Sequence, residues 1–232
     1  MSMFSNFDFD VIRRALPYLF LDGMTFTLTL TALSGAGGIV LGTLIALMRL
    51  SNAWLLGRIA ALYVDLIRSL PLVLVIFWFY FLVPYIGQWI TGAPRPIKVG
   101  AFASSLITFI MFEAAYFSEI MRAGIQSISR GQPAAAQALG LTYSQTMRYV
   151  VLPQAFRNML PVLLTQTIVL FQDTSLVYVV SIPDFLGAAS IVGQRDGRLV
   201  EMYLFAAIVY FAISSVASFG VRRLQARIAI VR

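Results

Sequence analysis

Residues 131–153 read GQPAAAQALGLTYSQTMRYVVLP, a polar stretch without acidic residues between two strongly apolar parts of the chain. Pro133 suits the first turn of a helix, and the alanines after it favour helix. Gly140 suits the left-handed residue that ends such a helix, and Thr142 with Gln145 is a capping-box pattern that starts another. The pattern predicts two short helices hinged at Gly140. Their alanine-rich face could enter a groove in another protein, although a surface connector without a partner fits the spacing equally well.

The composition of the chain indicates a membrane protein. The 232 residues are 59% hydrophobic and 12% charged, whereas soluble domains are roughly 25% charged. The long apolar runs are therefore expected to cross a membrane as helices. The predicted fold class is all-α with five transmembrane helices, which leaves no room for a separate soluble catalytic domain. The expected spans are residues 25–48, 70–86, 99–121, 159–182 and 200–221.

The spans divide the chain into three parts. Residues 1–24 are expected to be an N-terminal periplasmic or interfacial segment, residues 25–221 the transmembrane domain, and residues 222–232 a basic tail. The polar loop within the domain covers residues 123–157, and Pro153 is expected to end its second helix. Three further connections are expected: a short link at 51–58, an amphipathic interfacial segment at 60–67, and a polar loop at 183–198.

The distribution of arginines predicts the orientation in the membrane. More arginines share a side with the tail than lie on the opposite side, so the C-terminus is expected in the cytosol and the N-terminus in the periplasm. Arg13 and Arg14 precede only a short apolar patch, so the first span is expected to be an uncleaved anchor. The net charge of +7 does not indicate nucleic-acid binding, because the arginines flank apolar segments and do not cluster.

Several kinds of chemistry lack the residues they need. The chain has no cysteine and no histidine, which removes disulfides, the usual zinc ligands and Ser-His or Cys-His nucleophile pairs. A P-loop needs Gly-Lys-Ser/Thr, but Lys98, the one lysine of the sequence, follows Pro96 and Ile97. The sequence therefore predicts no catalytic residue, no metal site and no bound cofactor, and any ATP must be hydrolysed by another protein.

The polar loop resembles the EAA loop of permeases from binding-protein-dependent ABC importers. In that motif Glu-Ala-Ala is followed after three residues by Gly and, nine residues later, by Ile-x-Leu-Pro. The matching positions here are Ala135, Ala136, Gly140, Val150, Leu152 and Pro153. The chain departs from the motif at Ala134, where the family has its glutamate. The resemblance implies an ATPase-coupling loop that includes Gln132, Ala134, Ala135, Ala136, Gly140, Leu141 and Pro153.

Other segments resemble the polar amino-acid branch of these permeases. They are Tyr63–Pro71, Ala115–Gly124 and Asp173–Leu176, and Phe171–Val179 is similar to the glutamate/aspartate importers. The resemblance implies a type I ABC importer permease (MetI-like) fold in the bacterial inner membrane. It also implies a non-enzymatic subunit that imports glutamate or aspartate. The implied partners are two ABC ATPase subunits that hold ATP and Mg, a second related permease (as a heterodimer or a homodimer) and a periplasmic substrate-binding protein.

Ionisable residues inside spans are costly and are functional candidates by default. The residues expected to line the translocation path or a gate are Arg68, Glu113, Gln172, Asp173, Thr174 and Ser175. Glu113 could instead belong to a buried ion pair, and Arg68 could be an interfacial arginine whose head group reaches water. Glu119 and Arg122, one turn apart, are expected to form a local ion pair.

A different class of transporter is also compatible with these residues. An ion-gradient-driven transporter would work without an ATPase, and it would use intramembrane acids such as Glu113 and Asp173 as proton or sodium sites. These two acids leave this alternative open. The acidic side chain of Asp173 also has the wrong charge for direct binding of an acidic amino acid, which conflicts with the resemblance to glutamate and aspartate importers.

Overall fold

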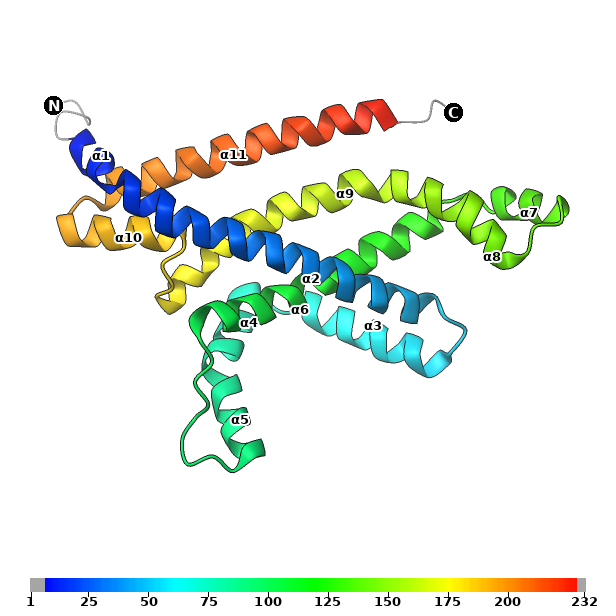
Figure 1. The fold of residues 1–232 in the computed structure, drawn as a ribbon, viewed down its shortest axis with the longest axis horizontal. Helices are drawn as coiled ribbons and strands as arrows, with labels where there is room; N and C mark the ends of the chain where they lie inside the picture. The colour runs from blue at the N-terminus through cyan, green and yellow to red at the C-terminus, as the bar shows by residue number, and fades with distance from the viewer. Residues whose placement is uncertain (1–6, 229–232) are drawn as a thin grey trace. The chain divides into compact units, whose positions relative to one another are not determined.

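The computed structural model describes residues 7–228, and this part of the chain is helical, with no β-strand. Figure 1 labels its α-helices: α1 (Phe9–Pro17), α2 (Thr25–Leu50), α3 (Trp54–Arg68), α4 (Leu72–Phe77), α5 (Val83–Thr91), α6 (Ala101–Gln126), α7 (Gly131–Ala138), α8 (Tyr143–Thr146), α9 (Leu152–Asp173), α10 (Phe185–Asp196) and α11 (Leu199–Ile228). The π-helical segments η1 (Tyr18–Met24), η2 (Trp78–Leu82) and η3 (Met147–Val151) and the 3-10 segment η4 (Thr174–Val180) continue them. Helices satisfy their backbone hydrogen bonds internally, as lipid requires.

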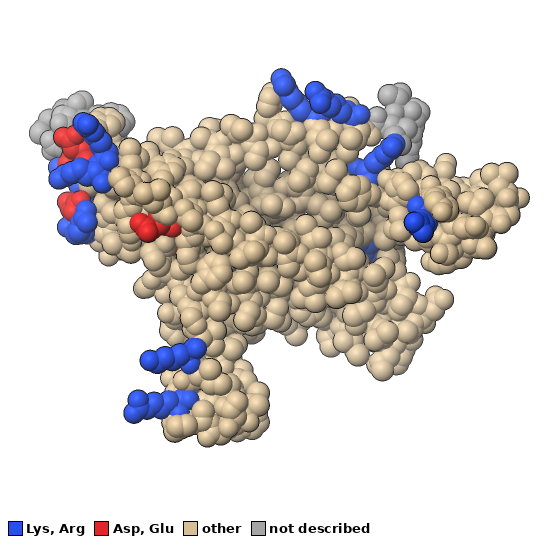
Figure 2. All heavy atoms as spheres, viewed as in Figure 1, with Lys and Arg blue, Asp and Glu red and all other residues tan. Residues whose placement is uncertain are grey.

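Within residues 7–228, five helical stretches are long and apolar enough to cross a membrane, which confirms the predicted number. They are Phe9–Leu50, Leu72–Thr91, Ala101–Gln126, Tyr143–Val180 and Leu199–Ile228. Each extends beyond its predicted bounds at one end or both, because capping and packing decide where a helix ends. The boundaries predicted after residues 24 and 221 consequently fall inside continuous helix. On the face drawn in Figure 2, uncharged side chains cover most of the surface.

The helices form two compact units. The first contains the residues up to Ser34, Pro71–Phe109 and Val169–Ala217, and the second contains Gly35–Leu70, Ile110–Ile168 and the residues from Ser218 onward. Each unit has a buried apolar core of its own.

The core of the first unit is built around α10, a helix that replaces the polar loop predicted at 183–198. Phe185, Ala188 and Val192 of α10 are buried against residues of α1, η1 and α11. The prediction was wrong because this segment has mixed polarity without a strong helical period, and its start depends on a cap. The Asp184 carboxylate accepts hydrogen bonds from the N–H groups of Leu186 at 3.1 Å and Gly187 at 2.9 Å.

Two hydrogen bonds fasten the start of α10 to other helices of the first unit. The N–H of Phe185 donates to Oγ1 of Thr27 in α2 at 3.0 Å. The hydroxyl of Tyr210 in α11 donates to Oδ2 of Asp184 at 3.3 Å. Asp184 is completely buried, and this burial raises its pKa to about 6, although the hydrogen bonds it accepts act in the opposite direction.

In the second unit, α2 and α6 approach each other closely at Gly42. A Cβ atom on Gly42 would lie 3.0 Å from the carbonyl oxygen of Ala114 and 3.1 Å from the amide nitrogen of Ser118, both backbone atoms. Small residues permit such close helix contacts in lipid, where van der Waals packing drives association.

The helix α3 runs beside the C-terminal half of α2 (Figure 1), and the hydroxyl of Tyr63 in α3 donates to the Met111 carbonyl of α6. The link predicted at 51–58 was too long, because α3 begins at Trp54. The amphipathic segment predicted at 60–67 is the C-terminal part of α3.

We expect Gly42→Ala to destabilise the protein and Gly57→Ala to leave it unchanged or slightly more stable. The new methyl group at 42 would press on backbone, which costs about 1–3 kcal/mol. At Gly57 the nearest atom to a Cβ is the Met48 carbonyl oxygen, 3.8 Å away, so the higher helix propensity of alanine dominates. Thermal unfolding in detergent measures both variants. Equal effects at the two positions would contradict the close contact.

A second prediction concerns pH and Asp184. Because the folded-state pKa is raised to about 6 from an unfolded value near 3.9, the folded state binds the proton more tightly. The contribution of Asp184 to stability is therefore complete below about pH 4 and is lost as the pH rises through 6. Asp184→Asn keeps a capping oxygen but does not titrate. The free energy of unfolding of the parent, minus that of this variant, should fall by about 2–3 kcal/mol between pH 4 and 7. A difference that stays flat or rises would contradict the burial argument.

Candidate functional site

The candidate site begins with the elbow, which comprises residues 131–153 between α6 and α9 (Figure 1). Its helix α7 ends in a Schellman motif: the N–H of Leu141 donates to the Ala136 carbonyl at 3.1 Å, and that of Gly140 to the Gln137 carbonyl at 2.9 Å. Gly140 has φ of +84°, a left-handed conformation that glycine adopts without steric cost. The backbone therefore turns at the residue where the sequence predicted a hinge.

The predicted capping box opens the second elbow helix, α8. Oγ1 of Thr142 accepts a hydrogen bond from the N–H of Gln145 at 3.3 Å, and Oε1 of Gln145 accepts one from the N–H of Thr142 at 2.9 Å. The expectation that Pro153 ends the run was wrong, because α9 starts at Leu152 and continues through it. The π-helical turn η3 ends at Val151, two residues before this proline, and changes the hydrogen-bond register near the position where the proline has no N–H to donate.

The elbow has a small buried core and an exposed apolar surface. Ile128, Val151 and Ala155 are buried together beneath it. In contrast, Leu139 is 82% exposed and Tyr143 is 73% exposed. These two side chains lie on either side of the turn at Gly140, so apolar surface is available to another molecule at the tip of the elbow.

The residues predicted for ATPase coupling lie along this elbow. Exposed positions are Gln132, Ala134, Ala135, Gly140 and Pro153, whereas Ala136 is buried and Leu141 is half-buried. Gln132 accepts a hydrogen bond from Nε2 of Gln154 at 3.3 Å, which links α7 to α9. Of the two alanines that match the Ala-Ala of the EAA motif, Ala135 is therefore exposed and Ala136 is buried in the elbow.

An ion cluster centred on Glu119 of α6 lies in the same unit. Its carboxylate pairs with Arg49 of α2, with Arg122 at 2.7 Å and with Arg68 of α3 at 4.0 Å. Arg122 also donates to Oε1 of Gln126 at 2.7 Å, at the end of α6. The predicted Glu119–Arg122 pair is confirmed, and it forms part of a cluster that joins three helices.

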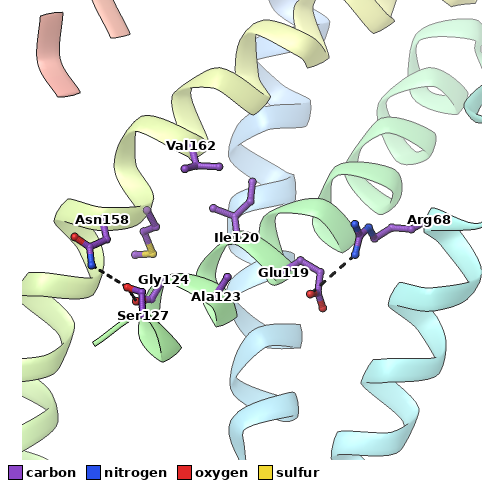
Figure 3. A pocket seen from close by; sticks show the side chains of 9 residues that line it. Arg68, Glu119, Ile120, Ala123, Gly124, Ser127, Asn158 and Val162 are labelled. Atoms are coloured by element: carbon purple, nitrogen blue, oxygen red, sulfur yellow. Dashed lines mark hydrogen bonds and ion pairs between the residues drawn. The ribbon is translucent and has the colours of Figure 1, made fainter. Parts of the chain in front are cut away.

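A pocket of about 390 Å³ opens beside this cluster (Figure 3). Its polar lining comes from Arg68, Glu119, Ser127 and Asn158, and Nδ2 of Asn158 donates to the hydroxyl of Ser127 at 2.8 Å. The remaining lining is formed by Ile120, Ala123, Gly124, Met159 and Val162. The volume lies near the lower end of the range for small-molecule pockets, about 300–1,000 Å³.

The other residues predicted for the translocation path fall in both units. In the second, Glu113 of α6 is completely buried and accepts hydrogen bonds from Nε2 of Gln166 at 3.2 and 3.3 Å. In the first, Nε2 of Gln172 donates to the Ser214 hydroxyl of α11 at 3.0 Å. Asp173, Thr174 and Ser175 follow it where α9 passes into η4, and the Thr174 side chain is completely buried.

Sequence reasoning did not select Arg49, Ser127 or Asn158 as site residues. The sequence around Arg49 has no motif that marks a site, and this arginine contributes only to the charge distribution that predicts the orientation. Ser127 and Asn158 lie 31 residues apart, on either side of the elbow. No local pattern connects such positions, because their proximity depends on how the elbow returns the chain toward α6.

Comparison with known proteins agrees with this architecture. Residues 38–230 match the family model described as "Binding-protein-dependent transport system inner membrane component". The chain is 53% identical to the glutamate/aspartate import permease protein GltK of Escherichia coli O6:H1, over 97% of this chain and 99% of that protein. It is 37% identical to the probable glutamine ABC transporter permease protein GlnP of Bacillus subtilis, over 89% of this chain and 92% of that one.

A solved structure has the same fold. The crystal structure of an amino acid ABC transporter with histidines superposes with a TM-score of 0.86 at 32% sequence identity, covering 98% of this chain and all of that one. The predicted type I permease fold is thereby confirmed. The chain therefore belongs to the family of binding-protein-dependent transport system inner membrane components, the multi-pass permease subunits of ABC importers.

Proposed function

We propose that this chain is the permease subunit of an ATP-driven importer of glutamate and aspartate. The observation that carries the proposal is the 53% identity to GltK, which extends over essentially the full length of both chains. The more distant relative named for glutamine, at 37% identity, supports amino acids as the wider substrate class.

Coupling to ATP hydrolysis takes place through the elbow. The sequence has no P-loop lysine in the required context, so the energy must reach this chain from a separate ATPase. The elbow offers that ATPase an exposed apolar turn at Leu139 and Tyr143 and an alanine-rich helix, α7. Because Ala134 replaces the family's glutamate, apolar contact takes the place of the acidic contact in this chain.

The complete transporter contains this chain, a second related permease, two ABC ATPase subunits and a periplasmic substrate-binding protein. ATP and Mg are held by the ATPase subunits. The chain lies in the bacterial inner membrane with its N-terminus in the periplasm, which places the elbow and the basic tail in the cytosol. The residues assigned to the translocation path or a gate are Arg68, Glu113, Gln172, Asp173, Thr174 and Ser175.

The transport cycle follows alternating access. Closure of the ATPase pair moves the elbows, and the permease opens toward the periplasm, where the binding protein releases its substrate. Hydrolysis then returns the path to its inward-open form. Each ligand favours a state only through its different affinity for the two states.

Reconstitution tests the proposed function. Proteoliposomes with all subunits and loaded binding protein should accumulate labelled glutamate and aspartate only when ATP is enclosed on the ATPase side. Glutamine and histidine should not be accumulated when the same binding protein is present. Uptake without an ATPase, driven by a proton or sodium gradient, would overturn the proposal in favour of an ion-coupled transporter.

We further expect Gly140→Val to uncouple hydrolysis from transport. A β-branched residue in the left-handed conformation costs on the order of 1–2 kcal/mol, so the elbow would leave its native turn. Glutamate uptake per ATP hydrolysed should fall about five- to thirtyfold, while the binding protein still binds glutamate.

Gly131→Ala is the matched control, because a Cβ atom there meets nothing within 4 Å and the backbone is not left-handed. Its uptake should equal that of the parent. If Gly140→Val transports normally, or if both variants fail alike, the left-handed turn is not part of the coupling.

A further inference from the structure

The ion cluster on Glu119 contains more positive than negative charge. One carboxylate pairs with the guanidinium groups of Arg49, Arg68 and Arg122. Asp65 lies near enough to Arg49 to interact with it, yet the five groups together still carry a net charge of about +1 if all are ionised. An uncompensated charge among apolar helices is unfavourable, so the cluster favours the approach of another anion.

The three arginines are not held equally. Arg122 contacts the carboxylate at 2.7 Å, and the side chains of Arg49 and Arg122 are 16% and 28% exposed. Arg68 is 4.0 Å from the carboxylate, and its side chain is 44% exposed. Its guanidinium lies 5.3 Å from the centre of the Tyr116 ring, which holds the group in place without using its planar N–H donors.

Arg68 also lines the pocket of about 390 Å³, together with two neutral hydrogen-bonding side chains, Ser127 and Asn158 (Figure 3). An arginine fork binds a carboxylate through two parallel hydrogen bonds. The Ser127 hydroxyl and the Asn158 side-chain amide can donate hydrogen bonds to a second oxygen-bearing group of the ligand, and neither adds charge to the pocket. The Glu119 carboxylate is already engaged by arginines, so it is poorly placed to attract the cationic group of a basic ligand.

We infer that this pocket is a binding site for the side-chain carboxylate of the transported acidic amino acid, and that Arg68 selects acidic over neutral substrates. The inference rests on the proposed function and deepens it. The pocket offers an anionic substrate a positive charge at Arg68, whereas Glu113 and Asp173 in the spans carry carboxyl groups. Ser127 and Asn158 are the neutral partners of the same ligand.

Direct binding is the test. The full transporter, with its second permease and ATPase subunits but without binding protein, is placed in phosphatidylcholine nanodiscs and titrated with labelled L-glutamate. Loss of a charge-assisted hydrogen bond should weaken binding about tenfold or more in Arg68→Gln. Arg68→Lys should retain part of the affinity, and Asn158→Ala should lose severalfold. L-glutamine should displace labelled glutamate poorly from the parent. It should displace it at least as well from Arg68→Gln.

Arg58→Gln is the matched control. Arg58 belongs to the same helix, is exposed, and stacks over Trp54 at 4.5 Å outside the pocket. Its glutamate affinity should equal that of the parent. Thermal unfolding of each variant separates loss of binding from loss of structure. If Arg68→Gln is unstable, Arg68→Lys tests the same site with the positive charge retained.

The outcomes separate this inference from the proposed function. If the reconstituted parent imports glutamate but Arg68→Gln binds and imports it equally well, the pocket inference is overturned and the proposed function stands. If the parent imports no acidic amino acid, both fail. A lipid phosphate offers the same anionic chemistry. If Arg68→Gln binds glutamate as tightly as the parent but loses binding of phosphatidylglycerol that the parent shows, a lipid head group occupies the pocket and the substrate assignment is overturned.

Discussion

The cost of placing charge among apolar helices shapes the second unit of this protein. Glu119 in α6 attracts arginines from α2 and α3 as well as from its own helix, and thereby joins three helices at one carboxylate. An arginine or glutamate alone in this setting would be strongly unfavourable, whereas together they fix which faces of the helices meet. The cluster also lies on the helix from whose end the elbow begins, since Arg122 reaches Gln126 at the C-terminus of α6. Movement of the elbow would therefore reach the ion cluster on Glu119 through α6.

The elbow itself combines a rigid base with an exposed tip. Its base is fixed by a buried apolar cluster that includes Ile128 and Val151, and its turn is fixed by the Schellman motif around Gly140. Leu139 at the tip remains exposed. Because its base and its turn are both fixed, the elbow can transmit force, and the exposed apolar side chains of Leu139 and Tyr143 at its tip offer a contact to another protein. This is why the proposed function assigns coupling to the elbow even though Ala134 replaces the family's glutamate.

Much of the fold could be predicted from the sequence because lipid imposes a simple rule on spans. Five apolar runs gave five membrane helices, and the cap residues Gly140, Thr142 and Gln145 gave the two elbow helices. Segments decided by tertiary contacts were not predictable. The helix α10 has a weak period and depends on the Asp184 cap and on burial in the first unit. Pro153 predicted the end of a helix, but the chain stays helical through it, because a π-helical turn lies just before α9. The pocket partners Ser127 and Asn158 meet only because the elbow folds back.

The central claim, that the elbow is the part gripped by a separate ATPase, can be measured directly because the chain has no cysteine of its own. A single Leu139→Cys variant, assembled with cysteine-free ATPase subunits and carrying a photoreactive label, should cross-link to the ATPase, and the yield should change on ATP addition. The same label at Trp89→Cys, 85% exposed at the end of α5, should not cross-link to it. Labelling of Leu139→Cys from the periplasmic side, or equal ATPase cross-linking from both positions, would contradict the account.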